Sequence, residues 1–272
     1  MSLTNRQFFL IAVLFYAAAL VFSVFSQRRG RWSGGLTNYL LLVAGLVPHT
    51  VMLGMRGFSL QRCPVNNLFE ATTFFLWAFL LVYAVMGGFP RFRFLGTYAA
   101  PLACGVGVFA LMPALDPPAG PRPEFSGAWI SLHATLILLS YGTFGLGSMA
   151  GVMFLTQDHD LKLHRLHAIV SKLPSIERIE RIETRLLISG WLLLTIGLAI
   201  IPVAVGSPGD VSFAGDAKVL WSLVVWCAYA GLVLWHLRFR LVGRRFAWGV
   251  VGSFVFVLLT FWGTNLMSRL HN

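Results

Sequence analysis

The sequence predicts an all-α protein, a polytopic bundle of about eight transmembrane helices with both termini on the outer side of the membrane. Composition is the first reason for this prediction. Hydrophobic residues make up 57% of the 272 residues, charged residues make up only 11%, and the mean hydropathy is +0.75. A soluble domain carries about 25% charged residues. We therefore expect lipid rather than water to surround the chain.

Long apolar stretches are the second reason. A hydrocarbon core about 30 Å thick needs about 20 helical residues, and a helix satisfies its own backbone hydrogen bonds. The stretches lack the alternation of a β-barrel, so residues 1–272 are interpreted as a single integral membrane domain. The predicted spans are Phe8–Phe25, Thr37–Leu53, Leu68–Met86, Phe94–Leu111, Ala128–Leu155, Leu186–Val205, Lys218–Leu237 and Phe246–Leu266.

The distribution of basic residues is the third reason, and it predicts the orientation. The loops after the first, third, fifth and seventh spans hold 15 of the 21 lysines and arginines. Cytoplasmic loops carry such an excess, so these loops are predicted to be inside and both termini outside. The basic residues form no single face, which argues against nucleic acid as a partner and in favour of membrane lipid.

The first span is predicted to be retained rather than removed as a signal peptide. Basic residues follow it at Arg28, Arg29 and Arg31, whereas only Arg6 precedes it, and no small-residue cleavage site ends it. The charged stretch Thr156–Arg185 is expected to form a short amphipathic cytoplasmic helix that begins near Pro174 and Ser175.

The sequence lacks the motifs that mark several classes of enzyme and carrier. The chain has no CxxC, which excludes a thiol–disulfide carrier of that type, and no CxxCH for covalent haem attachment. It also has no GxxxxGK(S/T) phosphate loop, as an ATPase would need.

Histidines are the ionisable residues that stand out near the membrane. At 1.5 Å per residue, His49 lies about 6 Å and His133 about 7–8 Å inside the outer boundary. His271 follows the last span on that side, whereas His236 lies near the inner side. Imidazole is a common ligand of metals and of haem iron, although an interfacial or packing role is the alternative for each residue taken singly. The histidines expected to be solvated are His159, His164 and His167.

Tryptophans form a second feature. Trp221, Trp226 and Trp235 lie in the seventh span beside His236. Residues 221 and 226 are five apart and so face different directions, which leaves open that one of them faces lipid. Trp32, Trp129 and Trp248 lie at span ends, where an aromatic belt is expected.

Four segments contain short motifs in an order that extends over most of the chain. They are Cys63–Thr72, Gly215–Trp226, Gly243–Trp248, and Phe261–Leu266 followed by His271. In this order they resemble four elements of the cytochrome c assembly protein family. These elements are P-x-x-N-L-F/Y-E-A/S, the second half of the signature W-x-W-D-P-K-E-x-W-x-L-x-x-W, a basic loop, and a closing N-x-L…H. The family includes CcsA/ResC, CcmC and CcmF proteins and shorter HemX-like and YpjD-like members.

The resemblance implies non-covalently bound haem b. By position, His133 and His271 match the family's two external ligands of haem iron, and His236 matches its membrane histidine. His49 serves a second haem site or only packs. Asp216, Lys218, Trp221 and Trp226 belong to the tryptophan-rich segment, where Lys218 either faces a haem propionate or snorkels at the helix start. Glu70 is expected to cap the third span or to pair with Arg62 or Arg56 rather than to contact a ligand.

The chain also departs from the family pattern. Val211–Gly215 stand where the family has tryptophans, and Ala217 and Val219 replace a proline and a glutamate. These departures point towards the short HemX-like or YpjD-like branch. A synthase activity would need a separate subunit, so enzyme activity by this chain alone is left open.

The resemblance implies haem handling for cytochrome c assembly, with haem presented at the outer face to apocytochrome c and a separate assembly subunit. One alternative is a HemX-like regulator that acts through the inner loops on a cytoplasmic haem-synthesis enzyme, glutamyl-tRNA reductase. Another is a transporter of a different solute. The expected location is the bacterial cytoplasmic membrane.

Overall fold

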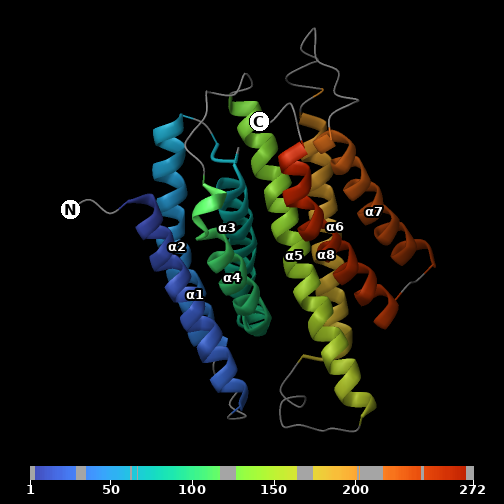
Figure 1. Ribbon diagram of the computed structural model, residues 1–272. Coiled ribbons are helices and arrows are strands. Elements are labelled where there is room, and N and C mark those ends of the chain that lie inside the picture. Colours follow the sequence, from blue (N-terminus) through green and yellow to red (C-terminus); the bar gives the residue numbers. More distant parts are fainter. Residues whose placement is uncertain are drawn as a thin grey trace.

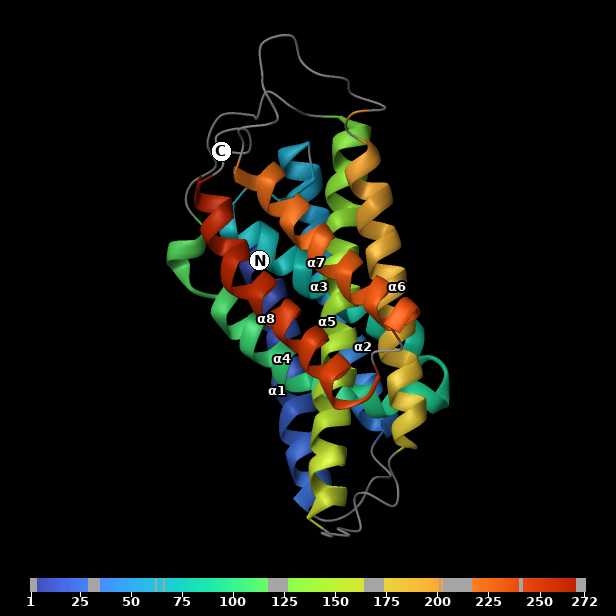
Figure 2. The same cartoon turned by 90° about the vertical axis from the view of Figure 1, so that its right-hand side faces the viewer.

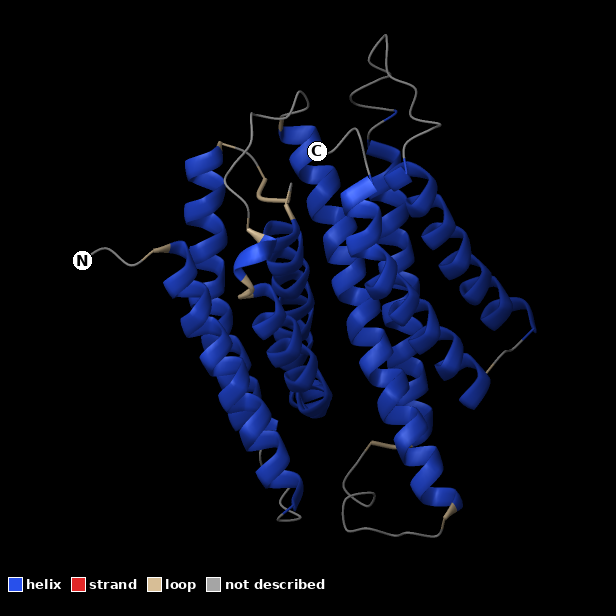
Figure 3. Ribbon diagram, viewed as in Figure 1, coloured by secondary structure: helices blue, strands red, loops and turns tan. Residues whose placement is uncertain are grey.

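The computed structural model describes residues 4–28, 35–61, 63–65, 67–116, 127–163, 174–200, 202, 217–239 and 242–267. Within these residues the secondary structure is helical, without strands, as Figure 3 shows. The α-helices are α1 (Asn5–Arg28), α2 (Gly35–Leu60), α3 (Leu68–Gly87), α4 (Gly96–Ala110), α5 (Ala128–Lys162), α6 (Ile176–Ile200), α7 (Ala217–Phe239) and α8 (Arg244–Met267). The short 3-10 helices η2 (Pro90–Leu95) and η3 (Pro113–Leu115) flank α4. The predicted all-α class is confirmed.

The helices have the length and apolarity that a bilayer requires. In the described part of the chain, seven helical segments are long and apolar enough to cross a membrane: six of them lie in α1, α2, α3, α5, α6 and α7, and one is formed by η2 with α4. Helix α8 has 24 residues, which is also long enough to span about 30 Å. The chain is therefore a multi-pass membrane protein.

Successive helices run in opposite directions, so their ends gather at two levels (Figure 1). The starts of α1, α3, α5 and α7 and the ends of α2, α4, α6 and α8 lie at the upper end of Figure 1. We name this the outer end, after the side that the basic residues predict, and the opposite one the inner end.

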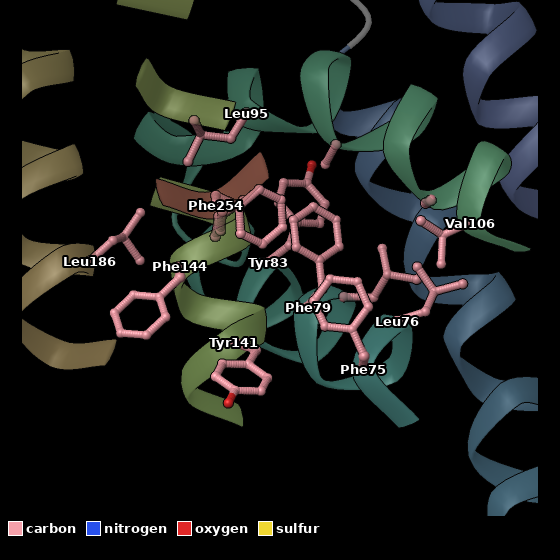
Figure 4. Packing of buried hydrophobic residues seen from close by; sticks show 14 of the residues in the cluster. Phe75, Leu76, Phe79, Tyr83, Leu95, Val106, Tyr141, Phe144, Leu186 and Phe254 are labelled. Atoms are coloured by element: carbon pink, nitrogen blue, oxygen red, sulfur yellow. The ribbon is translucent and has the colours of Figure 1, made fainter. Parts of the chain in front are cut away.

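Helix α5 is the centre of the bundle. It packs against α3 on one side and against α6 and α8 on the other, while α1 and α2 lie outside α3 and α4 (Figures 1 and 2). Aromatic side chains from α3 and α8 meet beside α5: the ring centroids of Phe75 and Phe254 lie 6.3 Å apart, next to Phe79 (Figure 4). Small residues permit this packing, because a Cβ atom on Gly142 would lie 2.6 Å from the backbone nitrogen of Phe79.

The expectation of a separate cytoplasmic helix that ends near Arg185 is wrong. Helix α6 starts directly after Ser175, whose carbonyl oxygen accepts the N–H groups of Arg178 and Ile179, and it continues without a break to Ile200. The physical reason is that Ile179 and Ile182 are buried and extend the apolar stripe of the predicted span towards the inner end. The expected loop residues 164–173 lie outside the described residues.

Candidate functional site

His133 lies near the outer start of α5 and its ring is half-buried. Its Nδ1 atom lies 2.7 Å from the carbonyl oxygen of Gly197, near the end of α6. A carbonyl oxygen only accepts, so Nδ1 carries the hydrogen and, in the neutral ring, Nε2 keeps its lone pair. A histidine that ligates a metal commonly has its other nitrogen fixed in this way.

Gly197 brings the two helices close together. A Cβ atom at this position would lie 2.9 Å from the Cδ1 atom of Ile137 on α5. The absence of a side chain therefore lets α6 approach α5 closely enough for its carbonyl oxygen to meet His133. A backbone acceptor has no signature in the sequence, and the sequence did not identify Gly197.

Trp221 on α7 contacts both α5 and α8, further from the outer end than His133. Its Nε1 atom donates a hydrogen bond to the hydroxyl of Thr260 on α8 at 2.7 Å, and its ring meets the ring of Tyr141 on α5 edge to face, with centroids 5.8 Å apart. His133 and Tyr141 are eight residues apart, about 12 Å along the helix. Trp221 thus contacts α5 deeper in the bundle than His133.

Trp226 on α7 contacts α6. Its Nε1 atom donates to the hydroxyl of Thr195 on α6 at 2.9 Å, and its ring lies 5.7 Å from that of Trp191. Both Trp221 and Trp226 are half-buried, whereas Trp235 is 56% exposed. The predicted divergence of residues 221 and 226 is confirmed, but it is Trp235 that points away from the protein.

His236 lies at the inner end of the bundle, near the last turn of α7. Its Nε2 atom is 3.5 Å from the hydroxyl of Thr184 on α6, and its ring packs against Phe246 of α8 with centroids 4.6 Å apart. Thr184 and Gly197 are 13 residues apart on α6, which places the contacts of His236 and His133 about 20 Å apart along that helix. The two histidines therefore mark opposite ends of one helix group.

His49 belongs to the other helix group. It is fully buried between α1, α2 and α3, and its Nδ1 atom lies 3.0 Å from the hydroxyl of Tyr16. The Phe9 ring packs against it at 5.0 Å. Among the described residues its Nε2 atom has no hydrogen-bond partner of good geometry, although it lies beside the backbone of Thr73. His49 thus packs apart from His133, although sequence placed the two at a similar depth.

A polar cluster occupies the outer end of α2 and α3. Arg56 donates through Nε to Glu70 at 2.9 Å and through Nη2 to Asp116 at 2.6 Å. Asn67 accepts the backbone N–H of Glu70 at 2.7 Å and so caps α3, while its amide donates to Asp116 at 3.2 Å. The expected pairing of Glu70 with Arg56 is confirmed, which gives the N-L-F-E-A element a structural role. The sequence did not reveal Asp116 as the second partner.

The remaining predicted site residues are not placed. His271 and Asp216 lie outside the described residues, and the side chain of Lys218 is not described although its backbone is in α7. His159 is exposed on the last turn of α5, as expected, and His164 and His167 lie outside the described residues. Of the two predicted haem ligands, the structure therefore describes His133.

The described residues fit one axial haem ligand at the outer end. His133 is held by a backbone carbonyl and keeps a lone pair on Nε2, as a ligand to iron requires. No group of three or more His, Cys, Asp or Glu side chains that could hold a bare metal ion occurs in the described ranges. With this geometry His133 can supply one nitrogen ligand to a metal.

Comparisons with known proteins agree with the motifs. A family model described as Cytochrome C assembly protein matches residues 65–271. The chain is 26% identical to cytochrome c biogenesis protein CcsA of Synechococcus sp. (strain CC9605), over 97% of this chain and 94% of that protein. It is 24% identical to the CcsA proteins of Gloeothece citriformis (strain PCC 7424) and Mesostigma viride, over 96% and 98% of this chain and 92% and 94% of those proteins. These alignments extend over nearly whole CcsA proteins and do not single out the shorter HemX-like or YpjD-like branch.

Proposed function

Because this chain belongs to the cytochrome c assembly protein family, we propose that it handles haem for cytochrome c biogenesis and holds haem b at the outer end of its bundle. The observation that carries the proposal is the hydrogen bond from His133 Nδ1 to the Gly197 carbonyl oxygen, which leaves Nε2 available. The near full-length similarity to proteins named cytochrome c biogenesis protein CcsA supports the biological setting.

In this proposal His133 and His271 hold the iron. The Gly197 carbonyl oxygen orients the His133 ring and raises the basicity of Nε2. When bound, haem supplies the macrocycle that becomes attached to the CxxCH cysteines of a c-type cytochrome. This chain has no CxxCH, so it would hold haem without a covalent bond and release it to apocytochrome c, together with a separate assembly subunit.

The tryptophan-rich helix supports the site from one side. Trp221 fixes α7 against α5 and α8, and Trp226 fixes it against α6. Helix α7 starts at Ala217, so the backbone of Lys218 lies on its first turn at the outer end. There, the ammonium group of Lys218 would pair with a haem propionate. His236 would assist at the inner end.

The side of the membrane on which we propose that haem is held rests on the orientation that the basic residues predict. With the outer end facing away from the cytoplasm of a bacterial cell, His133 faces the compartment in which c-type cytochromes are assembled. Nothing in the described residues favours a regulator of haem synthesis or a transporter of another solute over this proposal.

An absorption spectrum of the detergent-purified protein, first oxidised and then reduced with dithionite, tests the proposal. We expect a Soret band and sharp low-spin bands after reduction, and their loss in the double variant His133→Ala/His271→Ala. His159→Ala is the matched control, because His159 is an exposed histidine at the opposite end of the same helix, and it should retain the spectrum. A folded, colourless protein that also fails to bind added haemin would refute the proposal.

A further inference from the structure

The carboxyl group of Glu183 is fully buried at the inner end of the bundle. It lies on the second turn of α6, and neither of its oxygens has a hydrogen-bond partner among the described residues. No ion pair in the described part of the chain includes it. Buried carboxylates are rare unless they are paired, so this side chain requires an explanation.

The carboxyl group occupies space that a glycine leaves open. A Cβ atom on Gly151 of α5 would lie 2.7 Å from Oε1 of Glu183 and 3.1 Å from a methyl group of Val251 on α8. The Ala247 carbonyl oxygen lies 3.4 Å from the same Cβ position. Helices α5, α6 and α8 therefore meet at the carboxyl group.

The neighbouring charged groups that the structure describes do not compensate for a carboxylate. Glu180, one turn earlier on α6, accepts the backbone N–H of Gly243 at 2.8 Å and adds a second acidic group to this region. On α5, Gln157 donates its amide to the Pro174 carbonyl oxygen. On α7, His236 contacts Thr184 and Phe246. The nearby basic residues on α6 and α8 are all exposed: Arg181, Arg185, Arg244 and Arg245.

We propose that Glu183 binds a proton in the folded protein, and that the packing of α5, α6 and α8 at the inner end depends on this proton. A neutral carboxyl group costs far less to bury than a carboxylate. A metal cation in its place would need about six oxygen ligands, and the described residues provide no cluster of acidic, His or Cys side chains for one. A proton needs only the carboxyl oxygen itself.

The proposed proton site is connected to His236 by adjacent residues. Thr184, next to Glu183, is the residue on α6 that His236 approaches, and Phe246, next to Ala247, packs on the His236 ring. Ionisation of Glu183 would draw water between α6 and α8 and so move the two helices that contact His236 through Thr184 and Phe246. Protonation of Glu183 and the position of His236 are therefore expected to be linked, whether or not the chain binds haem.

Infrared spectroscopy of the detergent-purified protein, titrated from about pH 6 to about pH 10, tests the proposal. We expect a protonated-carboxyl C=O band at neutral pH that disappears at alkaline pH and is missing in Glu183→Gln. Glu177→Gln, an exposed glutamate on the first turn of the same helix, should keep the band. If Glu183→Gln does not accumulate, Glu183→Met has a similar volume and gives the same comparison.

The thermal midpoint gives a second readout. The folded protein holds a proton that the unfolded chain releases above about pH 4.3, so stability is present at low pH and is lost as the pH rises through the titration of the folded state. The wild type should lose more of its thermal midpoint towards alkaline pH than Glu183→Gln does. The proposal is overturned if Glu183→Gln keeps the whole carboxyl band, or if sodium ions rather than pH set the wild-type midpoint.

Discussion

The Nδ1 atom of His133 lies 2.7 Å from the carbonyl oxygen of Gly197, so the outer start of α5 is joined to the outer end of α6 through an imidazole ring. This hydrogen bond fixes both the orientation of the ring and the nitrogen that carries its hydrogen. The orientation of the proposed haem ligand therefore depends on the backbone of a glycine.

Substituting Gly197 with alanine should weaken haem binding without removing a ligand. The added Cβ atom would lie 2.9 Å from the Cδ1 atom of Ile137 and 3.3 Å from the Cβ atom of Leu136. Because a Cβ atom cannot rotate away, relief of this crowding moves α6 away from α5 and lengthens the bond to His133. Loss of a backbone partner to a metal-ligating histidine costs about 10-fold to 100-fold in affinity. Haemin titration followed at the Soret band measures the change.

Gly252→Ala is the control for this substitution, because a Cβ atom at Gly252 on α8 would have no neighbour within 4 Å. It should bind haemin as the wild type does. Equal affinity of Gly197→Ala and Gly252→Ala would show that the contact with Gly197 does not support a haem ligand.

The Arg56 cluster should contribute strongly to stability. Arg56 bridges Glu70 and Asp116, and the Glu70 side chain is only 1% exposed. Removing one partner of a buried ion pair leaves an uncompensated charge and costs about 3–5 kcal/mol, so Arg56→Leu should lower the free energy of unfolding by about that amount. The free energy of unfolding of Arg56→Lys should lie between those of the wild type and Arg56→Leu, because one ammonium group cannot reproduce the forked contacts of a guanidinium.

An exposed ion pair provides the comparison for Arg56. Lys162 lies 2.8 Å from Asp158 at the inner end of α5, and its side chain is 58% exposed. Lys162→Ala should cost less than about 1 kcal/mol. Unfolding in detergent, followed by tryptophan fluorescence, measures both variants, and a similar loss in the two would contradict the role assigned to the Arg56 cluster.

The sequence predicted the helices because a helix that spans lipid must be a long apolar stretch. It predicted the helix ends less well. Helix α2 was expected to stop at Leu53, where the apolar run ends, yet it continues to Leu60. The extra turns carry Arg56 to the Glu70 and Asp116 carboxylates, which compensate its charge. Tertiary pairing, which an apolarity pattern does not contain, decided the boundary.

The candidate site was predicted by residue type and depth but not by partner. The depth argument correctly placed His133 and His236 at opposite ends of the bundle. It also placed His49 level with His133, but His49 packs with Tyr16 in the other helix group, because depth along a helix says nothing of which neighbours the helix has. The backbone acceptor at Gly197 and the burial of Glu183 depend on helix packing and so had no signal in the sequence.

The close approach of α3 and α5 gives a third prediction. A Cβ atom on Gly142 would lie 2.6 Å from the nitrogen of Phe79 and 2.7 Å from the carbonyl carbon of Ala78. These are backbone atoms, which cannot rotate away, so Gly142→Ala should destabilise the protein by about 1–3 kcal/mol through overpacking. The thermal midpoint in detergent reports the effect.

Gly105→Ala on α4 is the matched control for Gly142, because a Cβ atom there would have no neighbour within 4 Å. It should leave stability unchanged or raise it by up to about 1 kcal/mol, since alanine favours the helix over glycine. A Gly142→Ala variant as stable as Gly105→Ala would mean that α3 and α5 are further apart than described.

The proposed orientation can be tested with the protein's own cysteines. Cys63 lies between α2 and α3 at the outer end and is partly exposed, whereas Cys104 and Cys227 lie within helices α4 and α7. If the outer end faces away from the cytoplasm, a membrane-impermeant maleimide should label Cys63 in intact spheroplasts, and Cys63→Ser should abolish the labelling. His159→Cys, placed in the Cys63→Ser background at the exposed inner end of α5, should react only after lysis. The reverse pattern would invert the topology and place His133 on the cytoplasmic side, where it could not present haem to an exported apocytochrome.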